Sequence, residues 1–234
     1  MPYIAAGRLE ELPPEIRTGL GAYRHEVFVR RLGWTIPTST GNQTSEWDQF
    51  DEGATVHIVA LSPGCRVCGC ARLMPTTGRY MLRDVFPELL GPEPHLASTT
   101  LWELSRFAGS APKSRDNSPG GHNAPGMQLF PYALALAASF GATDVIGVVS
   151  RSVERLYHRS GLNLQRIHPA VTARNGGIVA CSIELSPATF GRLGCDPHSL
   201  MKSIHWFGKS PLPHTTRGTG VAGDPGGLTA ATAG

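Results

Sequence analysis

The chain has 234 residues, of which 41% are hydrophobic and 17% are charged. This length suits one domain with a sizeable core, and the apolar content excludes a wholly disordered or fibrous chain. The formal net charge of +3 is too small to indicate nucleic-acid binding without a local basic patch. Neither a long apolar run nor a signal-peptide pattern occurs in the sequence. We therefore expect a cytoplasmic protein that does not span a membrane.

Glycine and proline are unevenly distributed along the chain. They are frequent in the polar segment 112–126 and again in the segment 208–234, which has few residues to bury. Such compositions are typical of a long loop and a disordered tail. The sequence therefore predicts one folded domain over residues 1–207, a mobile loop at 112–126 and a disordered tail at 208–234.

The rest of the chain alternates between helix-like and strand-like patterns. Ile16, Leu20, Tyr23 and Val27 recur at helical spacing and predict an amphipathic helix over residues 14–32. The further expected elements are strands at 55–62 and 66–74, a short helix at 81–90, a strand at 100–108, a helix at 127–140, a strand at 143–149, a helix at 151–160, and strands at 163–168 and 177–186. This order predicts an α/β (α+β) fold with a mixed, largely antiparallel sheet.

The five cysteines do not form a recognisable disulfide or zinc pattern. Cys65, Cys68 and Cys70 are clustered, whereas Cys181 and Cys195 are far away in the sequence. No second cysteine or histidine pair completes a zinc-binding spacing. We expect Cys68 and Cys70 to lie on one face of a strand as small buried side chains, and we expect no metal site.

Three short clusters combine charged, polar and aromatic residues. Helical spacing places Arg24 and Phe28 on one face, with Trp34 just beyond the helix end. An ordinary helix with core aromatics would look similar. The second cluster, at 46–52, interleaves acidic and aromatic residues, which is also the composition of a solvated turn.

The third cluster places charges inside an apolar strand at 102–107. Regular alternation would put Glu103 and Ser105 on one face and Arg106 on the other. A β-bulge near Ser105 would instead let Glu103 and Arg106 reach the same cleft. The alternative is an edge strand with a structural ion pair.

Taken together, these clusters resemble the signature of the acyl-homoserine lactone synthases, the enzymes that make autoinducers for bacterial quorum sensing. The resemblance extends from about residue 3 to residue 207 and leaves out the tail. The matching residues are Arg24, Phe28, Trp34, Asp48, Asp51, Arg72, Phe86, Glu103 and Arg106.

The resemblance implies a three-layer α/β/α sandwich similar to the Gcn5-related N-acetyltransferases. It also implies that S-adenosylmethionine is a substrate, that acyl carrier protein donates the acyl group, and that no cofactor is needed. The amine of S-adenosylmethionine would be acylated. Its carboxylate would then displace methylthioadenosine and close the lactone ring.

On this basis the catalytic residues are expected to be Glu103 as general base, Ser105 beside the oxyanion, and Arg106. Either Arg24 or Arg106 would hold the substrate carboxylate. The expected S-adenosylmethionine site consists of Arg24, Phe28, Trp34, Asp48, Asp51, Arg72 and Phe86. In this site the aromatic rings would face the sulfonium or adenine, and the aspartates would bind the ammonium or support the arginines.

The acyl chain is expected to lie between the helix at 127–140 and the strand at 143–149. The expected pocket residues are Trp102, Leu104, Met127, Val149 and Ser150. Some members of the family that carry a threonine in this region are associated with 3-oxo chains. Because Val149 and Ser150 occupy it here, we expect an unsubstituted, octanoyl-like chain.

The helix at 151–160 carries Arg151, Arg155 and Arg159 at four-residue intervals. Acyl carrier protein is acidic, so this basic stripe is a candidate docking surface. A solvated helix face is the alternative.

Two other function classes remain open. A coenzyme A-dependent N-acetyltransferase of the same fold needs a glycine-rich turn led by Arg or Gln, and that spacing is absent around Gly120, Gly121 and Gly126. A binding module that contacts nucleic acid through the basic helix lacks a recognisable motif.

Overall fold

The computed structural model describes residues 3–35, 44–91, 96–109, 126–168 and 177–209. The predicted mobile loop at 112–126, apart from Gly126, lies outside these residues. The predicted tail also lies outside them beyond residue 209. Within the described ranges, no helix is long and apolar enough to cross a membrane.

In the part of the chain that the structure describes, eight strands form one mixed sheet in the order β6-β7-β5-β4-β3-β2-β1-β8. The strands are β1 (Tyr3–Gly7), β2 (Val56–Leu61), β3 (Val67–Pro75), β4 (Leu101–Gly109), β5 (Asp144–Ser150), β6 (Gln165–Arg166), β7 (Ile178–Glu184) and β8 (Ile204–Trp206). The β4–β5 and β1–β8 pairs are parallel, and the other pairs are antiparallel. The predicted mixed, largely antiparallel sheet is confirmed.

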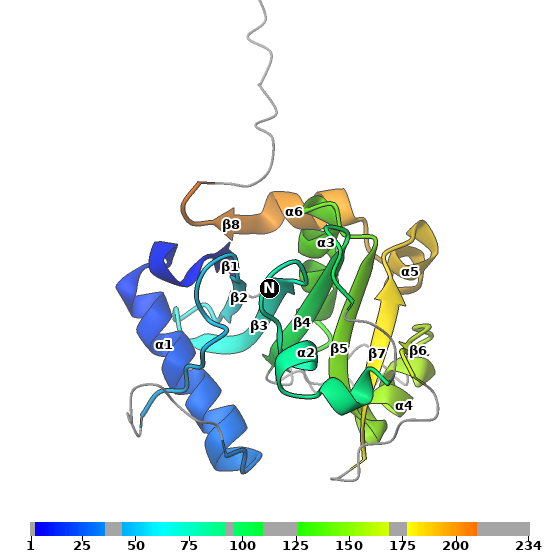
Figure 1. Cartoon of the computed structure of the whole chain (residues 1–234). Helices are drawn as coiled ribbons and strands as arrows, with labels where there is room; N and C mark the ends of the chain where they lie inside the picture. Colours follow the sequence, from blue (N-terminus) through cyan, green and yellow to red (C-terminus); the bar gives the residue numbers. More distant parts are fainter. Residues whose placement is uncertain (1–2, 36–43, 92–95, 110–125, 169–176, 210–234) are drawn as a thin grey trace, which may run out of the picture.

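Within the described ranges, six α-helices and three short helices of other types connect the strands. The α-helices are α1 (Pro14–Arg24), α2 (Met81–Asp84), α3 (Phe130–Ser139), α4 (Arg151–Arg159), α5 (Pro187–Arg192) and α6 (Pro197–Ser203). The others are the 3-10 helices η1 (Leu9–Glu11) and η3 (Pro87–Leu89) and the π-helix η2 (His25–Arg31). In Figure 1, α2 lies in front of the sheet and α3 lies behind it.

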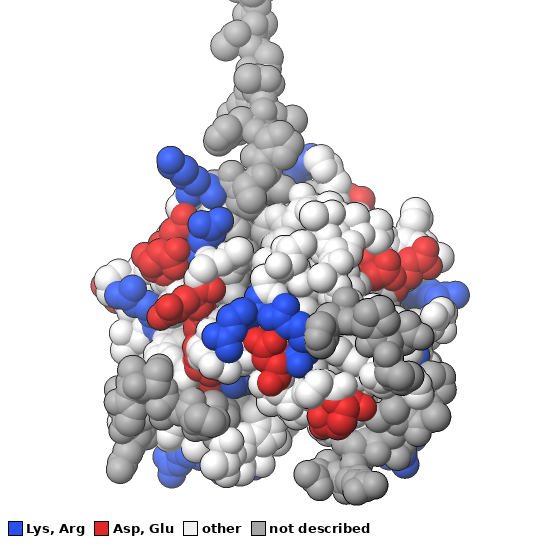
Figure 2. Space-filling model, in the orientation of Figure 1, with Lys and Arg blue, Asp and Glu red and all other residues white. Residues whose placement is uncertain are grey.

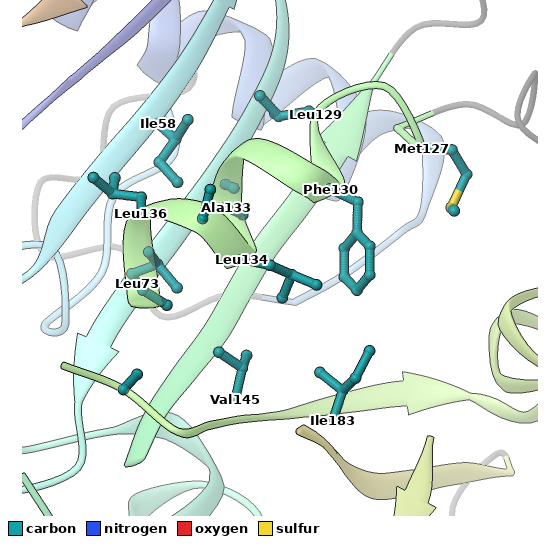
Figure 3. Packing of buried hydrophobic residues seen from close by; sticks show 14 of the residues in the cluster. Ile58, Leu73, Met127, Leu129, Phe130, Ala133, Leu134, Leu136, Val145 and Ile183 are labelled. Carbon is teal, nitrogen blue, oxygen red and sulfur yellow. The ribbon is translucent and has the colours of Figure 1, made fainter. Parts of the chain in front are cut away.

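Alternation along the strands buries one apolar layer on each side of the sheet. On β3, Leu73 belongs to the cluster that includes Leu134 and Leu136 of α3. Its strand neighbour Met74 belongs to a cluster on the opposite face, with Leu82 of α2. Figure 3 shows the first cluster, where α3 packs across residues from several strands. The fold is therefore the expected three-layer α/β/α sandwich.

The predicted helix at 14–32 consists of two different segments. The α-helix α1 continues directly into the π-helix η2, and Gly33 ends the run with a φ of 67°. Five short elements, β1, η1, α5, α6 and β8, were not expected from the sequence. β1 and β8 are short strands that pair with each other, so their ladder depends on contacts between the two ends of the domain.

The prediction for the cysteine thiols is wrong in one respect. An irregularity between Ala60 and Leu61 interrupts the β2–β3 register. As a result, Cys70 packs in the cluster on the α1 side, whereas Cys68 packs against the α3 side. Both thiols donate to backbone carbonyls, that of Cys68 to Ala60 and that of Cys70 to Arg106. In the described part of the chain, no group of His, Cys, Asp or Glu residues is arranged to hold a metal ion.

The parallel strands β4 and β5 separate after a short paired stretch. Their ladder ends at the pair of Glu103 and Ile146, although β5 continues to pair with β7 as far as Ser150. At Gly147, a Cβ atom would lie only 2.8 Å from the Leu104 carbonyl oxygen, so a side chain there would clash with the backbone of β4. Beyond this contact, the β4-facing peptide groups of β5 are not paired with β4, and a cavity opens between the strands.

Candidate active site

The cavity between β4 and β5 has a volume of about 1120 Å³ and passes between the two layers of helices. At one end it is lined by the partly exposed side chains of Trp34 and Val85, which are 44% and 43% exposed. At the other end it is lined by Phe130, Tyr157 and Leu164, each at most 8% exposed. The cavity is therefore open at the η2 and α2 end and closed beneath α3 and α4.

Beside the open end, three arginines and three carboxylates form a buried ionic network. Arg24, at the end of α1, donates from Nε to Glu46 at 2.6 Å. Its two terminal nitrogens donate to both oxygens of Asp51, at 2.6 and 3.0 Å. Burial alone would lower the pKa of Arg24, but the charges of Asp51 and Glu46 outweigh it and raise the pKa. All three guanidinium nitrogens of Arg24 are thus paired with carboxylates inside the protein.

The other two arginines come from adjacent strands. Arg72 donates from Nη1 to Asp48 at 2.6 Å and to Asp51 at 2.8 Å. Arg106 donates from Nη2 to Glu46 at 3.1 Å and to Asp48 at 2.5 Å. Each carboxylate therefore accepts from two arginines, which satisfies charges that would be very costly to bury alone.

A β-bulge on β4 directs Arg106 into this network. Arg72 pairs with Ser105 and Cys70 pairs with Ala108, so two residues of β4 oppose a single residue of β3. Arg106 has a φ of 45°, in the left-handed region that non-glycine residues rarely adopt. The bulge predicted near Ser105 is confirmed, and both Glu103 and Arg106 line the cavity.

Close packing against α1 places the segment that carries Glu46. The backbone N–H of Glu46 donates to the Gly21 carbonyl at 3.0 Å. A Cβ atom at Gly21 would lie 2.8 Å from the indole of Trp47, so only glycine allows this approach. The guanidinium of Arg24 lies over the Trp47 ring, 4.9 Å from its centroid.

Burial and the charges of the network also shift the pKa values of Asp51 and of its neighbour His57. Burial would raise the pKa of Asp51, but Arg24 and Arg72 outweigh this effect and hold the pKa well below its usual value. His57 is buried, with Nε2 3.1 Å from the Asp51 carbonyl oxygen. Burial lowers the pKa of His57 to about 4, against the opposing effect of Asp51. His57 is therefore neutral at physiological pH.

Glu103 stands apart from the arginine network, in the wall of the cavity. Its carboxylate accepts hydrogen bonds from the backbone N–H groups of Met81 at 2.6 Å and Leu82 at 3.0 Å, at the start of α2. Burial raises the pKa of Glu103 to about 7, and the Met81 donor, the charge of Arg72 and the Leu82 donor oppose part of that rise. A carboxylate with such a pKa can accept a proton near neutral pH.

Aromatic rings flank the open end of the cavity. Phe28 and Trp34 stack with their ring centroids 4.9 Å apart. The Arg106 guanidinium lies 5.6 Å from the Phe28 centroid and 5.7 Å from that of Trp34. Phe86 also lines this part of the cavity. The open end thus combines aromatic faces with ionic groups.

The structure brings together most, but not all, of the residues predicted for the site. Phe28, Trp34, Asp48, Phe86, Glu103, Ser105, Arg106, Leu104, Val149 and Ser150 line the cavity. The predicted site residues Arg24, Asp51 and Arg72 instead support it from the buried network. Trp102 and Met127 do not line the cavity: Trp102 stacks on Phe140 at 4.8 Å, and Met127 lies in the α3-side core.

Two network members were not predicted as site residues. Glu46 joins Arg24 to Arg106, and Met81 places its thioether sulfur 2.9 Å from Arg72 Nη2. The acidic character of 46–52 was the sequence signal for Glu46. The sequence held no comparable signal for Met81, which is apolar and follows a turn.

The basic stripe predicted at 151–160 lies on the outer face of α4. Arg151, Arg155 and Arg159 are exposed, whereas Val153 and Tyr157 of the same helix line the cavity. Glu154 is bound by Arg166 of β6 through contacts of 2.6 and 2.8 Å. The helix therefore joins a basic surface to the closed end of the cavity.

The sequence is similar to those of one family of known proteins. Residues 15–193 match the model of the family described as autoinducer synthase. The chain belongs to the autoinducer synthase family. It is 40% identical over 188 residues to the acyl-homoserine-lactone synthase of Ralstonia solanacearum, covering 78% of this chain and 89% of that protein. The corresponding synthase of Pseudomonas aeruginosa is 38% identical over 174 residues, covering 74% of this chain and 82% of its own length.

A solved structure supports the same assignment. The crystal structure of TofI, in a ternary complex with an inhibitor and MTA, is 35% identical and has a TM-score of 0.69. The match covers 85% of this chain and 99% of TofI. This autoinducer synthase is therefore an enzyme with the fold of the acyl-homoserine-lactone synthases, and the cavity described above is its candidate active site.

Proposed function

We propose that this synthase acylates the amine of S-adenosylmethionine with an acyl group from acyl carrier protein, and then closes the lactone with release of methylthioadenosine. The observation that carries the proposal is the position of Glu103. A buried carboxylate with a pKa near 7 lines the same cavity as the Asp48 carboxylate and the Phe28 and Trp34 rings. TofI was solved with MTA, the usual abbreviation of methylthioadenosine, which is consistent with this scheme.

The open end of the cavity supplies groups of the right kind for S-adenosylmethionine. Asp48 lines the cavity and offers negative charge to the substrate ammonium. Phe28 and Trp34 present aromatic faces to the sulfonium and the adenine. Arg24 is only 1% exposed and fully paired, so Arg106 is the better candidate to bind the substrate carboxylate. Among the described residues, the acceptor for Arg106 Nη1 is the Met81 thioether, at 3.5 Å, a weak partner that a carboxylate can replace.

Acyl transfer begins with removal of a proton from the ammonium. Glu103 takes this proton, directly or through a water molecule, and the free amine attacks the thioester carbonyl. The new N–C bond forms, the C–S bond of the thioester breaks, and the departing thiolate takes up the second proton that the nitrogen loses. Peptide groups of β5 beyond Ile146, which β4 leaves unpaired, and the Ser105 hydroxyl are candidate donors to the oxyanion.

Closure of the lactone then depends on the position of the substrate carboxylate relative to the γ-carbon. The carboxylate oxygen attacks the γ-carbon, the O–C bond forms, and the C–S bond to the sulfonium breaks to give neutral methylthioadenosine. The sulfonium is already a good leaving group, so the enzyme must mainly hold the carboxylate against the carbon. These steps require no cofactor or metal ion.

The proposed acyl donor and the proposed length of the acyl chain are supported by different features. The exposed arginines of α4 favour an acidic carrier protein, and the glycine-rich turn typical of coenzyme A binding is absent from the sequence. Val149 and Ser150 line the cavity without the threonine associated with 3-oxo chains. We therefore propose an unsubstituted chain of medium length, such as octanoyl.

The proposal is tested with purified enzyme and S-adenosylmethionine. Octanoyl-carrier protein and octanoyl-coenzyme A are supplied in parallel at equal concentrations, and products are identified by mass spectrometry. The expected result is octanoyl-homoserine lactone, formed faster from the carrier protein. Faster turnover of the coenzyme A thioester would contradict the proposed donor, and formation of only an N-acylated product without a lactone would contradict the proposed reaction.

A further inference from the structure

The closed end of the cavity contains a hydroxyl group that has no partner among the residues that the structure describes. Tyr157 lines the cavity from α4 and is 5% exposed, and its ring stacks on Phe130 with centroids 4.9 Å apart. Its hydroxyl makes no hydrogen bond to any residue in the described ranges. Burial raises the pKa of Tyr157, with no charged neighbour contributing.

Tyr157 forms part of the cavity wall, and its hydroxyl is not among the fully buried unpartnered atoms of the described residues. In the described parts of the chain, the buried side-chain atoms that lack both a partner and contact with solvent are His168 Nδ1 and Trp206 Nε1. The Tyr157 oxygen does not belong to this group, although its side chain is almost fully buried. Because Tyr157 lines the cavity and is only 5% exposed, the cavity is the route by which a ligand would meet its hydroxyl.

The surroundings of the hydroxyl are apolar. Leu164 and Ile183 line the same end of the cavity, and Phe107 packs against Phe130 from the β4 side at 5.6 Å. An acyl chain that stops short of this end leaves room for water to bond the hydroxyl. A longer chain displaces that water and offers no acceptor, which leaves a buried hydroxyl unsatisfied.

We propose that the Tyr157 hydroxyl limits the length of the acyl chain that this enzyme accepts. The inference rests on the proposed function, because it assumes that the acyl chain enters this cavity. The discrimination would be polar as well as steric. An unsatisfied buried hydroxyl penalises a long alkyl chain by roughly tenfold, whereas a chain that ends in its own hydroxyl can bond to Tyr157.

The test compares the wild-type enzyme with Tyr157→Phe, which removes the oxygen and keeps the ring. Both are assayed with carrier-protein donors of increasing length from hexanoyl to dodecanoyl, and with the matching omega-hydroxy chains. The expected result is a roughly tenfold rise in kcat/KM for the longest plain chains relative to octanoyl in Tyr157→Phe. The wild-type preference for omega-hydroxy over plain long chains should be lost in the same variant.

Tyr132→Phe is the matched control, because Tyr132 lies on α3 but does not line the cavity. It should leave the chain-length profile unchanged. An unchanged profile in Tyr157→Phe, with a shift only in Tyr157→Leu, would overturn the proposal and indicate that ring size alone sets the limit. If the wild-type enzyme forms no lactone from any donor, the proposed function fails, and that outcome is distinct from failure of this inference.

Discussion

Arg106 Nη2 lies 3.1 Å from Glu46 Oε1, although the two residues are 60 positions apart in the sequence. This ion pair joins the bulge of β4 to the segment that precedes β2. Arg24 bonds to the other oxygen of Glu46 at 2.6 Å, so one carboxylate holds two cations from separate elements. The wall of the candidate active site therefore depends on a residue that does not itself line the cavity.

The variant Glu46→Gln should destabilise the fold strongly. Glutamine keeps the shape but removes the charge that compensates Arg24 and Arg106, and a broken buried ion pair typically costs about 3–5 kcal/mol. The free energy of unfolding, measured by urea denaturation, should fall by about that amount. The matched control is Glu26→Gln, whose partner Arg30 is exposed and 3.6 Å away. This control should change stability by about 0.5 kcal/mol or less, and an equal loss in both variants would refute the structural role of the network.

The variant Glu103→Gln should lose turnover and retain binding. Amide replacement keeps the size but cannot accept the ammonium proton, so kcat should fall by about 10²–10⁴ with little change in the KM for S-adenosylmethionine. In the wild-type enzyme, kcat should rise with pH with an apparent pKa of about 7, and this step should be absent from the variant. The exposed Glu184 of β7 provides a control, since Glu184→Gln should behave like wild type. Normal turnover in Glu103→Gln would remove Glu103 as the base.

The raised pKa of Glu103 also predicts a pH dependence of stability. Its pKa rises from 4.5 to about 7 on folding, so the folded state holds the proton more tightly than the unfolded chain between these values. Stability contributed by this group therefore falls as pH increases through that window, by about 3 kcal/mol in total, and is constant above it. His57 acts in the opposite direction, because its pKa falls from 6.5 to about 4 and its contribution is lost as pH decreases.

The two effects are separated by comparing the wild type with Glu103→Gln at each pH. The stability of the variant relative to wild type should increase between pH 5 and pH 7, because glutamine does not titrate. Urea denaturation at a series of pH values measures this difference. A difference that stays constant across the range would show that Glu103 titrates normally in the folded protein.

Charge reversal on α4 should impair the use of carrier protein selectively. The double variant Arg155→Glu and Arg159→Glu should raise the KM for octanoyl-carrier protein about tenfold, because the docking surface would repel an acidic partner. The KM for S-adenosylmethionine should not change, since both residues are exposed on the outer face of the helix. Arg192→Glu on α5 is the control for a change in net charge. Equal changes in both KM values would argue against docking at α4.

The sequence predicted the local features of the fold better than its long-range contacts. The strand at 100–108 and its bulge appear as β4, and the bulge lets both Glu103 and Arg106 line the same cavity. The short strands β1 and β8 escaped prediction because each is defined by pairing across the domain. The short helix expected at 81–90 is divided into α2 and η3 at Phe86 and Pro87.

For the site, residue type indicated which groups would converge but not the depth at which each would lie. Arg24 and Arg106 looked equivalent in the sequence, yet Arg24 is sealed within the network and Arg106 reaches the cavity. Trp102 was expected to line the acyl-chain pocket. The register of β4 instead turns its ring away from the cavity and onto Phe140. Such distinctions depend on tertiary packing, which residue spacing does not encode.

The most direct test of the proposed reaction is the stoichiometry of its three products. Purified enzyme is incubated with S-adenosylmethionine and octanoyl-carrier protein, and lactone, methylthioadenosine and free carrier thiol are quantified in the same samples. Acylation followed by internal displacement predicts that all three appear in equal amounts throughout the time course. Release of thiol without methylthioadenosine would contradict the account, since it would mean that the enzyme transfers the acyl group but does not close the lactone.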